Sequence, residues 1–307
     1  MLKQSKTQIS LVIALGLMVV SQVGFVLYKN SASDVPAQVM PERRISHAGS
    51  AKAFGLAAPQ EKHFQVSSVK ELDSVFNSCD YNLKKAKRGG EVPRLYLTKL
   101  PQDMKYKKSS GNATFIQVLL PHILKVNEQI LMDRNRLLEM QKRQKAGHHL
   151  RHSEKMWLSK LASEHRCKST KIEVLLKHVD VVPPSLALAQ AMLETGGGRS
   201  FAALKKNSPF GYMATKTKVA KFESLLHSVQ AYVLNLNRHS AYAGFRTHRA
   251  EQRKQNQNPC GHKLAPLLTK YSVRGSAYTK DLQHLIQRHG LKDYDHITLE
   301  QHMRLKP

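Results

Sequence analysis

The sequence places a single carboxyl group, Glu194, at the end of an apolar helix. Pro183 and Pro184 favour a helix start at the beginning of this run, and glycine at 196 or 197 can end a helix in the left-handed conformation. The helix dipole and the apolar neighbours both disfavour a negative charge in the last turn, so we predict a raised pKa for Glu194. A carboxyl still protonated near neutral pH can act as a general acid. The alternative is a solvated glutamate before a capping glycine.

The helix that carries Glu194 shows no continuous polar face. Residues 186–193 are apolar except for Gln190, so this helix is expected to be buried on nearly all sides. Gln190 precedes Glu194 by four residues and therefore lies on the same side of the helix. We expect Gln190 to help bind the substrate beside the acid.

The elements that must position this helix are mainly helical, with one small β-hairpin directly after the glutamate helix. The hairpin is predicted in 208–222, where Thr and Val alternate with Lys. An extended segment is predicted at 94–101, before the first long helix. Helices are predicted, from periodicity and capping residues, at 66–76, 112–145, 153–165, 170–179, 224–239 and 276–290.

The composition favours an anionic partner, because the formal net charge is +27, from 49 Lys and Arg against 22 Asp and Glu. Cys79, Cys167 and Cys260 are too few for a disulfide framework and too scattered for a zinc site. The three histidines within 147–152 lack acidic or cysteine neighbours, which indicates a basic surface segment. No metal site and no cofactor is predicted.

The N-terminus predicts the compartment. Residues 9–27 form an uncharged run of 19 residues, about the length that spans a bilayer, and Lys3 and Lys6 precede it. We expect an uncleaved transmembrane anchor with the rest of the chain outside the cytoplasm; a cleaved signal peptide is the alternative. That compartment argues against nucleic acid as the anionic partner.

Several motifs, in order along the chain, resemble a known family. The glutamate helix and its glycine turn are followed by "FG" at 210–211, the hairpin and "SVQAYVLNLNRHSAYAGFR". This order resembles the Bax-type proteins of the bacterial endo-β-N-acetylglucosaminidase family, whose relatives include the C-terminal domain of flagellar FlgJ and the autolysin glucosaminidases. The resemblance spans roughly 94–292 and includes "PRLYLTKLP", "LLPHILKVNEQIL" and "YSVRGSAYTKDLQHLI".

The resemblance implies a lysozyme-like α+β fold and cleavage of peptidoglycan, with Glu194 as the catalytic acid. It also implies that Phe210 and Gly211 line the sugar cleft. Tyr242 is expected near the acid, where it would steady a developing positive charge or a water molecule. For Tyr242 the alternative is a buried tyrosine whose hydroxyl is hydrogen-bonded.

The sequence departs from the family pattern in ways that bear on chemistry. The usual "ESGWG" has Gly197 in place of tryptophan, and the segment 199–222, where many relatives carry a second carboxylate, contains no Asp or Glu. Its lysines and arginines suggest a positive cleft wall that suits the carboxylates of peptidoglycan stem peptides. The next acid, Glu223, precedes the helix cap Ser224, where a negative charge is favoured for structural reasons alone.

Together these features predict a peptidoglycan hydrolase that is held in the inner membrane by a single-pass anchor, with its catalytic domain in the periplasm. It would cleave β-1,4 linkages at N-acetylglucosamine by general acid catalysis, assisted by the acetamido group of the substrate. A lytic transglycosylase and a non-catalytic peptidoglycan-binding or scaffold protein are the alternatives. The expected segments are an anchor (1–30), a linker (31–62), a helical region (63–150), the glucosaminidase domain (151–295) and a tail (296–307).

Overall fold

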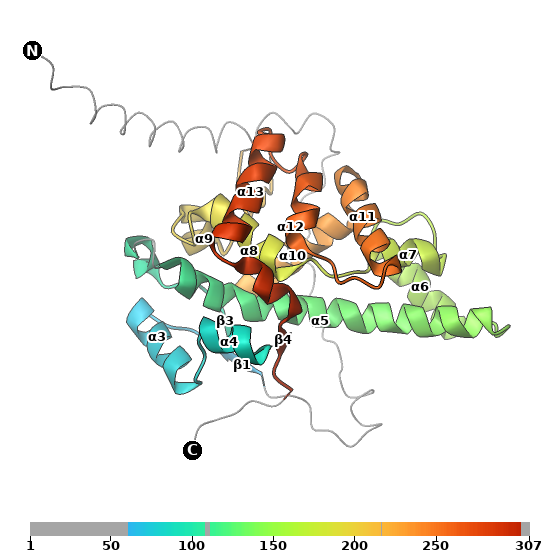
Figure 1. The fold of residues 1–307 in the computed structure, drawn as a ribbon, viewed down its shortest axis with the longest axis horizontal. Coiled ribbons are helices and arrows are strands. Elements are labelled where there is room, and N and C mark those ends of the chain that lie inside the picture. Colours follow the sequence, from blue (N-terminus) through green and yellow to red (C-terminus); the bar gives the residue numbers. More distant parts are fainter. Residues whose placement is uncertain (1–60, 108–110, 216, 302–307) are drawn as a thin grey trace, which may run out of the picture.

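The computed structural model describes residues 61–107, 111–215 and 217–301, and this part of the chain is mainly helical, as predicted (Figure 1). The predicted membrane anchor, residues 9–27, and nearly all of the predicted linker lie outside the described residues. Within the described ranges, every helix falls short of the length or apolarity needed to span a membrane.

The helices and strands follow one another along the chain with few long gaps. The α-helices are α3 (Val69–Ser78), α4 (Leu83–Gly89), α5 (Gly111–Lys145), α6 (His152–Glu164), α7 (Ile172–His178), α8 (Pro184–Thr195), α9 (Phe201–Lys206), α10 (Leu225–Arg238), α11 (Ala243–Lys254), α12 (Gly261–Leu264) and α13 (Ser276–Arg288). Short 3-10 helices are η2 (Gln102–Tyr106), η3 (Ser240–Tyr242), η4 (Ala265–Leu268) and η5 (Leu291–His296). The strands are β1 (Lys62–Phe64), β2 (Glu91–Val92), β3 (Leu95–Leu97) and β4 (Thr298–Leu299).

Local sequence signals account for several helix ends. Ser68 caps α3 and Ser224 caps α10, each with a side-chain oxygen that accepts a backbone N–H from the first turn. Gly196 ends α8 in the left-handed conformation, with φ +60°. Helices α4, α9, α11 and α12 were not predicted; α9 is only six residues long and begins at the cap Ser200.

The predicted hairpin is present in a reduced form. A single antiparallel bridge joins Met213 and Val219. Two backbone hydrogen bonds hold it, from the Ala214 N–H to the Lys218 carbonyl at 2.8 Å and from the Ala220 N–H to the Tyr212 carbonyl at 2.7 Å. This segment therefore carries little regular sheet.

Two parallel strand pairs that were not predicted join distant parts of the chain. Strand β1 pairs with β3, and β2 pairs with β4 near the end of the described residues. Ile297 and Leu299 are buried in this second connection, so the segment predicted as a tail begins inside the fold. The core formed there is shared by α3, α5, α8, α10 and α13, and the division into domains stays a prediction.

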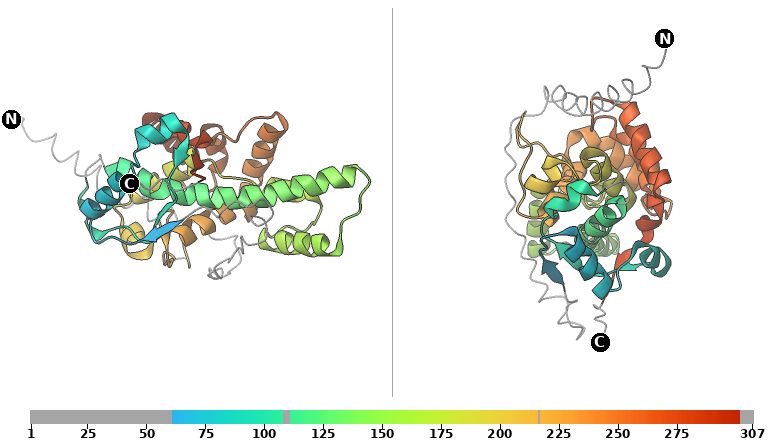
Figure 2. Two further views of the ribbon diagram at one scale, coloured as in Figure 1. Left: turned by 90° about the horizontal axis from the view of Figure 1, so that it is seen from below. Right: turned by 90° about the vertical axis from the view of Figure 1, so that its left-hand side faces the viewer.

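Helix α8 lies at the centre of the molecule, against α5, α12, α13 and η5 (Figure 1). Nearly all of its side chains are buried, as its lack of a polar face predicted. The second half of α5 extends beyond this body, and α6 runs back beside it (Figure 2). A separate hydrophobic cluster, with Leu137, Leu158 and Leu175 among its members, holds α5, α6 and α7 together.

A buried charge cluster fixes the segment that leads into α8. The Asp180 carboxylate accepts a hydrogen bond from Arg253 at 2.9 Å, and Arg134 lies 3.4 Å and Arg249 4.0 Å away. Burial alone would raise the pKa of Asp180, but the three arginines outweigh it and hold the pKa below the ordinary value. Asp180 and Arg249 are almost fully buried, so this cluster ties α5, α7 and α11 to the start of α8.

We expect Asp180→Asn to lower the free energy of unfolding by about 3–5 kcal/mol, because it leaves buried arginines without a counter-charge. The matched control is Asp293→Asn, which removes an exposed carboxylate that pairs with Lys87 at 2.9 Å and should change stability by about 1 kcal/mol or less. Urea unfolding at pH 7 followed by circular dichroism measures both. Equal effects of the two substitutions would contradict a structural role for the buried cluster.

Candidate active site

Glu194 lies in the last turn of α8 with its side chain partly exposed. Burial raises the pKa of this carboxyl from 4.5 to about 7, although a hydrogen bond from Tyr278 and the positive charge of Arg274 both act to lower it. The Tyr278 hydroxyl donates to Glu194 Oε1 at 3.0 Å. A carboxyl with this pKa holds a proton in a substantial fraction of molecules at neutral pH, which is what a general acid requires.

Gln190 lies next to Glu194, as the four-residue spacing predicted, but on the inner side. Its amide Nε2 donates to the Tyr278 hydroxyl at 2.9 Å, and its Oε1 accepts from the Tyr232 hydroxyl at 2.7 Å. The side chain is fully buried. We therefore assign Gln190 to positioning the acid rather than to the direct substrate contact that the sequence suggested.

The sequence did not reveal that Tyr278, from α13, is the residue that touches the acid. Its ring stacks on that of Tyr271, with centroids 5.6 Å apart, and both tyrosines are largely enclosed by the core. Both belong to the motif "YSVRGSAYTKDLQHLI", which supported the family resemblance. The motif contained the signal, but 84 residues separate Tyr278 from Glu194, and only the packing of α13 on α8 reveals the contact.

Tyr242, predicted near the acid, is buried in the same aromatic cluster. Its ring centroid lies 5.7 Å from that of His239 and 6.1 Å from that of Tyr271. Tyr271 and Tyr278 thus connect it to Glu194. A part for Tyr242 at the reacting atoms stays a prediction.

The two residues of the "FG" motif have different positions. Phe210 is fully buried and stacks on Tyr232 with centroids 3.9 Å apart, so it supports the cluster from inside. Gly211 has φ +61°, and a Cβ atom there would lie 3.4 Å from Glu194 Oε2. Of the predicted sugar contacts, Gly211 is therefore the one that lies at the second oxygen of the acid.

The glycine turn after Glu194 packs on the first turns of α5. A Cβ atom at Gly197 would lie 2.3 Å from Asn112 Oδ1, and one at Gly198 would lie 2.5 Å from the ring of Phe115. Both glycines also have positive φ. A tryptophan at Gly197 would displace the Asn112 side chain and would have to adopt φ +74°, a backbone conformation that favours glycine.

Glu223, the next acid along the chain, is exposed. It precedes Ser224, which caps α10, and its carboxylate lies 3.5 Å from His227 Nδ1. This is the structural position that the sequence predicted. Among the basic residues of the segment before it, Lys205, Lys218 and Lys221 are exposed.

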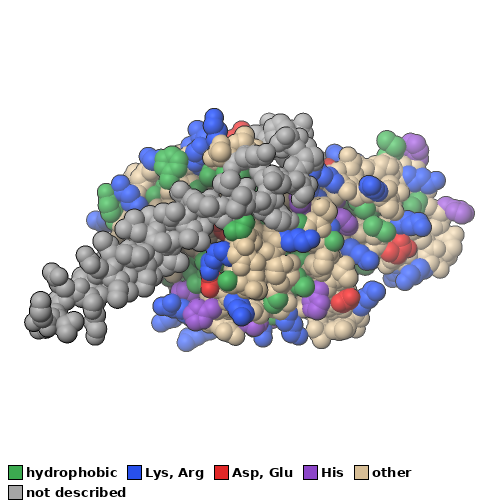
Figure 3. All heavy atoms as spheres, turned by 90° about the horizontal axis from the view of Figure 1, so that it is seen from above, with side chains coloured by type: hydrophobic (Ala, Val, Ile, Leu, Met, Phe, Trp, Pro, Cys, Tyr) green, Lys and Arg blue, Asp and Glu red, His purple; other side chains and the backbone are tan. Residues whose placement is uncertain are grey.

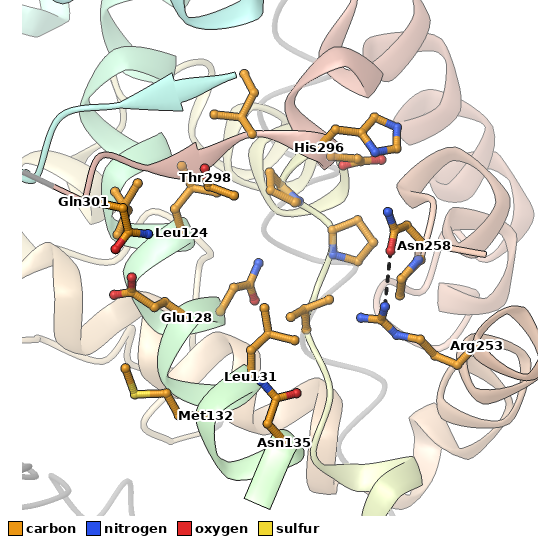
Figure 4. A pocket seen from close by; sticks show the side chains of 18 residues that line it. Leu124, Glu128, Leu131, Met132, Asn135, Arg253, Asn258, His296, Thr298 and Gln301 are labelled. Atoms are coloured by element: carbon orange, nitrogen blue, oxygen red, sulfur yellow. Dashed lines mark hydrogen bonds between the residues drawn. The ribbon is translucent and has the colours of Figure 1, made fainter. Parts of the chain in front are cut away.

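A cavity of about 430 Å³ lies at the opposite end of α8, beside Pro183 and Pro184 (Figure 4). Its two acidic side chains have partners within the fold, because Glu128 pairs with Arg94 and Asp295 accepts from Ser185. Its lining includes none of the residues around Glu194. This cavity is therefore separate from the candidate active site.

The cysteines and histidines form no metal site in the part of the chain that the structure describes. No group of three or more His, Cys, Asp or Glu side chains there could hold a metal ion. Cys79, Cys167 and Cys260 are all free thiols.

Comparisons with known proteins match this chain to a family model and to a bacterial relative. Residues 171–291 match the glucosaminidase family model, which is described as mannosyl-glycoprotein endo-β-N-acetylglucosaminidase. The chain is 30% identical over 214 residues to the protein bax of Escherichia coli strain K12. The aligned residues cover 62% of this chain and 77% of that relative. No solved structure gives a significant match.

The raised pKa of Glu194 predicts a pH-dependent stability. Between pH 4.5 and about 7 the folded state keeps a proton that the unfolded state releases, so the free energy of unfolding falls as pH rises through this window. Glu194→Gln removes this dependence. We expect the variant to gain about 1–2 kcal/mol relative to wild type between pH 5 and pH 8, measured by urea unfolding. The control, Glu223→Gln, alters an exposed carboxyl and should show no comparable gain; a gain of equal size in both would refute the shifted pKa.

Proposed function

This chain belongs to the Bax-type family of glucosaminidases, and on that premise we propose that it cleaves β-1,4 linkages at N-acetylglucosamine in peptidoglycan, with Glu194 as the general acid. The observation that carries the proposal is a carboxyl whose burial raises its pKa to about 7, at the helix end where the family resemblance expects the acid. We extend the proposal to the fold, as a lysozyme-like arrangement in which a central glutamate helix precedes a small hairpin.

In the proposed reaction, Glu194 gives its proton to the glycosidic oxygen as the bond to the anomeric carbon breaks. The transition state has oxocarbenium character, and the carboxylate that remains can then take a proton from the attacking water. Partial burial favours this cycle because it keeps the acid protonated until the sugar oxygen needs the proton.

The second group in the reaction is proposed to come from the substrate. The segment 199–222 contains no acid, and Glu223 is exposed beside His227 at the start of α10. The acetamido oxygen of N-acetylglucosamine can attack the anomeric carbon instead, and water then opens the resulting ring. This route needs one protein carboxyl, and Glu194 supplies it.

The charge of the chain supports an acidic polymer as the substrate. Lysine and arginine side chains are spread over the face shown in Figure 3, where Asp and Glu are few. The exposed lysines 205, 218 and 221 belong to the segment that follows the glycine turn. We propose that they attract the carboxylates of the stem peptides.

We expect Glu194→Gln to lower turnover of purified peptidoglycan by about two to four orders of magnitude while glycan binding persists, because amide nitrogen cannot donate the required proton. Glu223→Gln should lower turnover about tenfold or less, because the acetamido-assisted route remains. Equal, severe losses in both variants would show that two carboxylates take part.

Mass spectrometry of the products from the wild-type digest identifies the reaction. Reducing N-acetylglucosamine ends support the glucosaminidase, whereas anhydro-muramyl ends would identify a lytic transglycosylase, which also needs one glutamate. Binding with no product from the wild type would identify a non-catalytic peptidoglycan-binding protein.

We also propose that residues 9–27 anchor the chain in the inner membrane, with the catalytic part in the periplasm, because the run is uncharged and follows Lys3 and Lys6. The full-length protein should therefore fractionate with membranes and keep its N-terminus. N-terminal sequencing of the purified protein checks this, and a mature chain that begins near residue 30 would reveal a cleaved signal peptide instead.

A further inference from the structure

We infer that a one-way chain of hydrogen bonds, from Tyr232 through Gln190 to Tyr278, orients the Glu194 carboxyl and leaves Oε2 as the oxygen that carries the transferable proton. The catalytic part of this inference, the transfer of the proton from Oε2 to a substrate, rests on the proposed function. It makes Tyr278 and Gln190 positioning residues of the acid.

The direction of the chain follows from the number of protons available. The Tyr232 hydroxyl donates to Gln190 Oε1 at 2.7 Å, so the amide faces Tyr278 with its Nε2, which donates to the Tyr278 oxygen at 2.9 Å. A phenol carries one proton. Since the Tyr278 oxygen already accepts from Gln190, its own proton can point to Glu194 Oε1, at 3.0 Å.

Burial keeps this direction fixed. Gln190 is 0%, Tyr232 1% and Tyr278 3% exposed, so water has little access to compete for their polar groups. Reversing the direction of one hydrogen bond would place two donors or two acceptors against each other inside the core. Each group left without a partner would cost about 1–3 kcal/mol of stability. Stacking of Tyr232 on Phe210, at 3.9 Å, restrains one end of the chain.

The two oxygens of Glu194 therefore have different surroundings. Oε1 faces the buried Tyr278 hydroxyl, where a sugar has no access. Oε2 lies on the side of Gly211, where the absent side chain leaves space; a Cβ atom there would come within 3.4 Å. A proton on Oε1 would be held inside the protein, whereas a proton on Oε2 can pass to a substrate.

The chain of hydrogen bonds also stabilises Glu194 after it has given up its proton. The Tyr278 hydroxyl donates to the carboxylate and lowers the pKa of Glu194 against the larger effect of burial. A reversed chain would have the opposite effect, because Tyr278 would then accept a hydrogen bond from protonated Glu194 and favour the acid form. The two directions thus predict shifts of opposite sign when the Tyr278 hydroxyl is removed.

The test is Tyr278→Phe, which keeps the ring and removes the donor. The acid works in its protonated form, so activity falls as pH rises through the pKa of Glu194. Loss of the donor should move this alkaline limb of the kcat profile on soluble glycan strands upward by about half to one pH unit. We expect kcat to fall about tenfold with KM within about twofold, since the carboxyl loses its orientation.

The matched control is Tyr271→Phe. It removes a phenol hydroxyl from the same aromatic cluster, but that hydroxyl donates to the Phe210 carbonyl at 3.2 Å. The alkaline limb of this variant should stay where it is in wild type. An unchanged or downward limb in Tyr278→Phe, or equal shifts in both variants, would overturn the inference.

A second measurement separates this inference from the proposed function. Carbon NMR of protein labelled at the glutamate carboxyls follows the titration of Glu194 without substrate, with Glu194→Gln to assign the signal. Its midpoint should rise in Tyr278→Phe even if the wild type proves inactive on peptidoglycan; an unchanged or lower midpoint refutes the chain. If Tyr278→Phe does not fold, Gln190→Met is measured in its place. A one-way chain of hydrogen bonds predicts that the midpoint of the Glu194 titration rises in this variant. An unchanged or lower midpoint would refute the inference.

Discussion

The fold depends on the enclosure of α8, a helix that has almost no polar surface. Such a helix is stable in water only when other elements cover it on all sides, and here α5, α12, α13 and η5 provide that cover. Buried charged and polar groups therefore gather at the two ends of this helix. Asp180 and its arginines lie before the first turn, and Glu194 lies in the last.

The same enclosure produces the chemistry of Glu194. A carboxyl at the end of an apolar helix loses part of its hydration, and this loss raises its pKa into the range where it can both hold and release a proton. Complete burial of Glu194 would block access of the substrate, and complete exposure would return its pKa to the ordinary value of a glutamate. Tyr278 donates to one oxygen and Gly211 lies beside the other, so the two oxygens of this carboxyl have different surroundings.

Both packing and backbone conformation favour glycine in the turn after Glu194. Asn112 and Phe115 press against the turn after Glu194, so the first turns of α5 set the path of the chain there. At Gly197 a tryptophan would meet the Asn112 side chain and would need φ +74°, which favours glycine. The aromatic surroundings of the acid come instead from tyrosines on α10 and α13.

Local sequence patterns determined the helices α3, α5, α6, α7, α8, α10 and α13, but not α4, α9, α11 and α12. They also determined the caps at Ser68 and Ser224, the position of Glu194 at the end of α8 and the direction of its pKa shift, because spacing, capping and local polarity act within a few turns. They also placed Gln190 on the same side as the acid. Tertiary structure alone decided that Gln190 is buried and that Tyr278 donates to Glu194. It also decided that β4 pairs with β2. These contacts join residues far apart in the chain, and their formation depends on how whole helices pack, which no local pattern records.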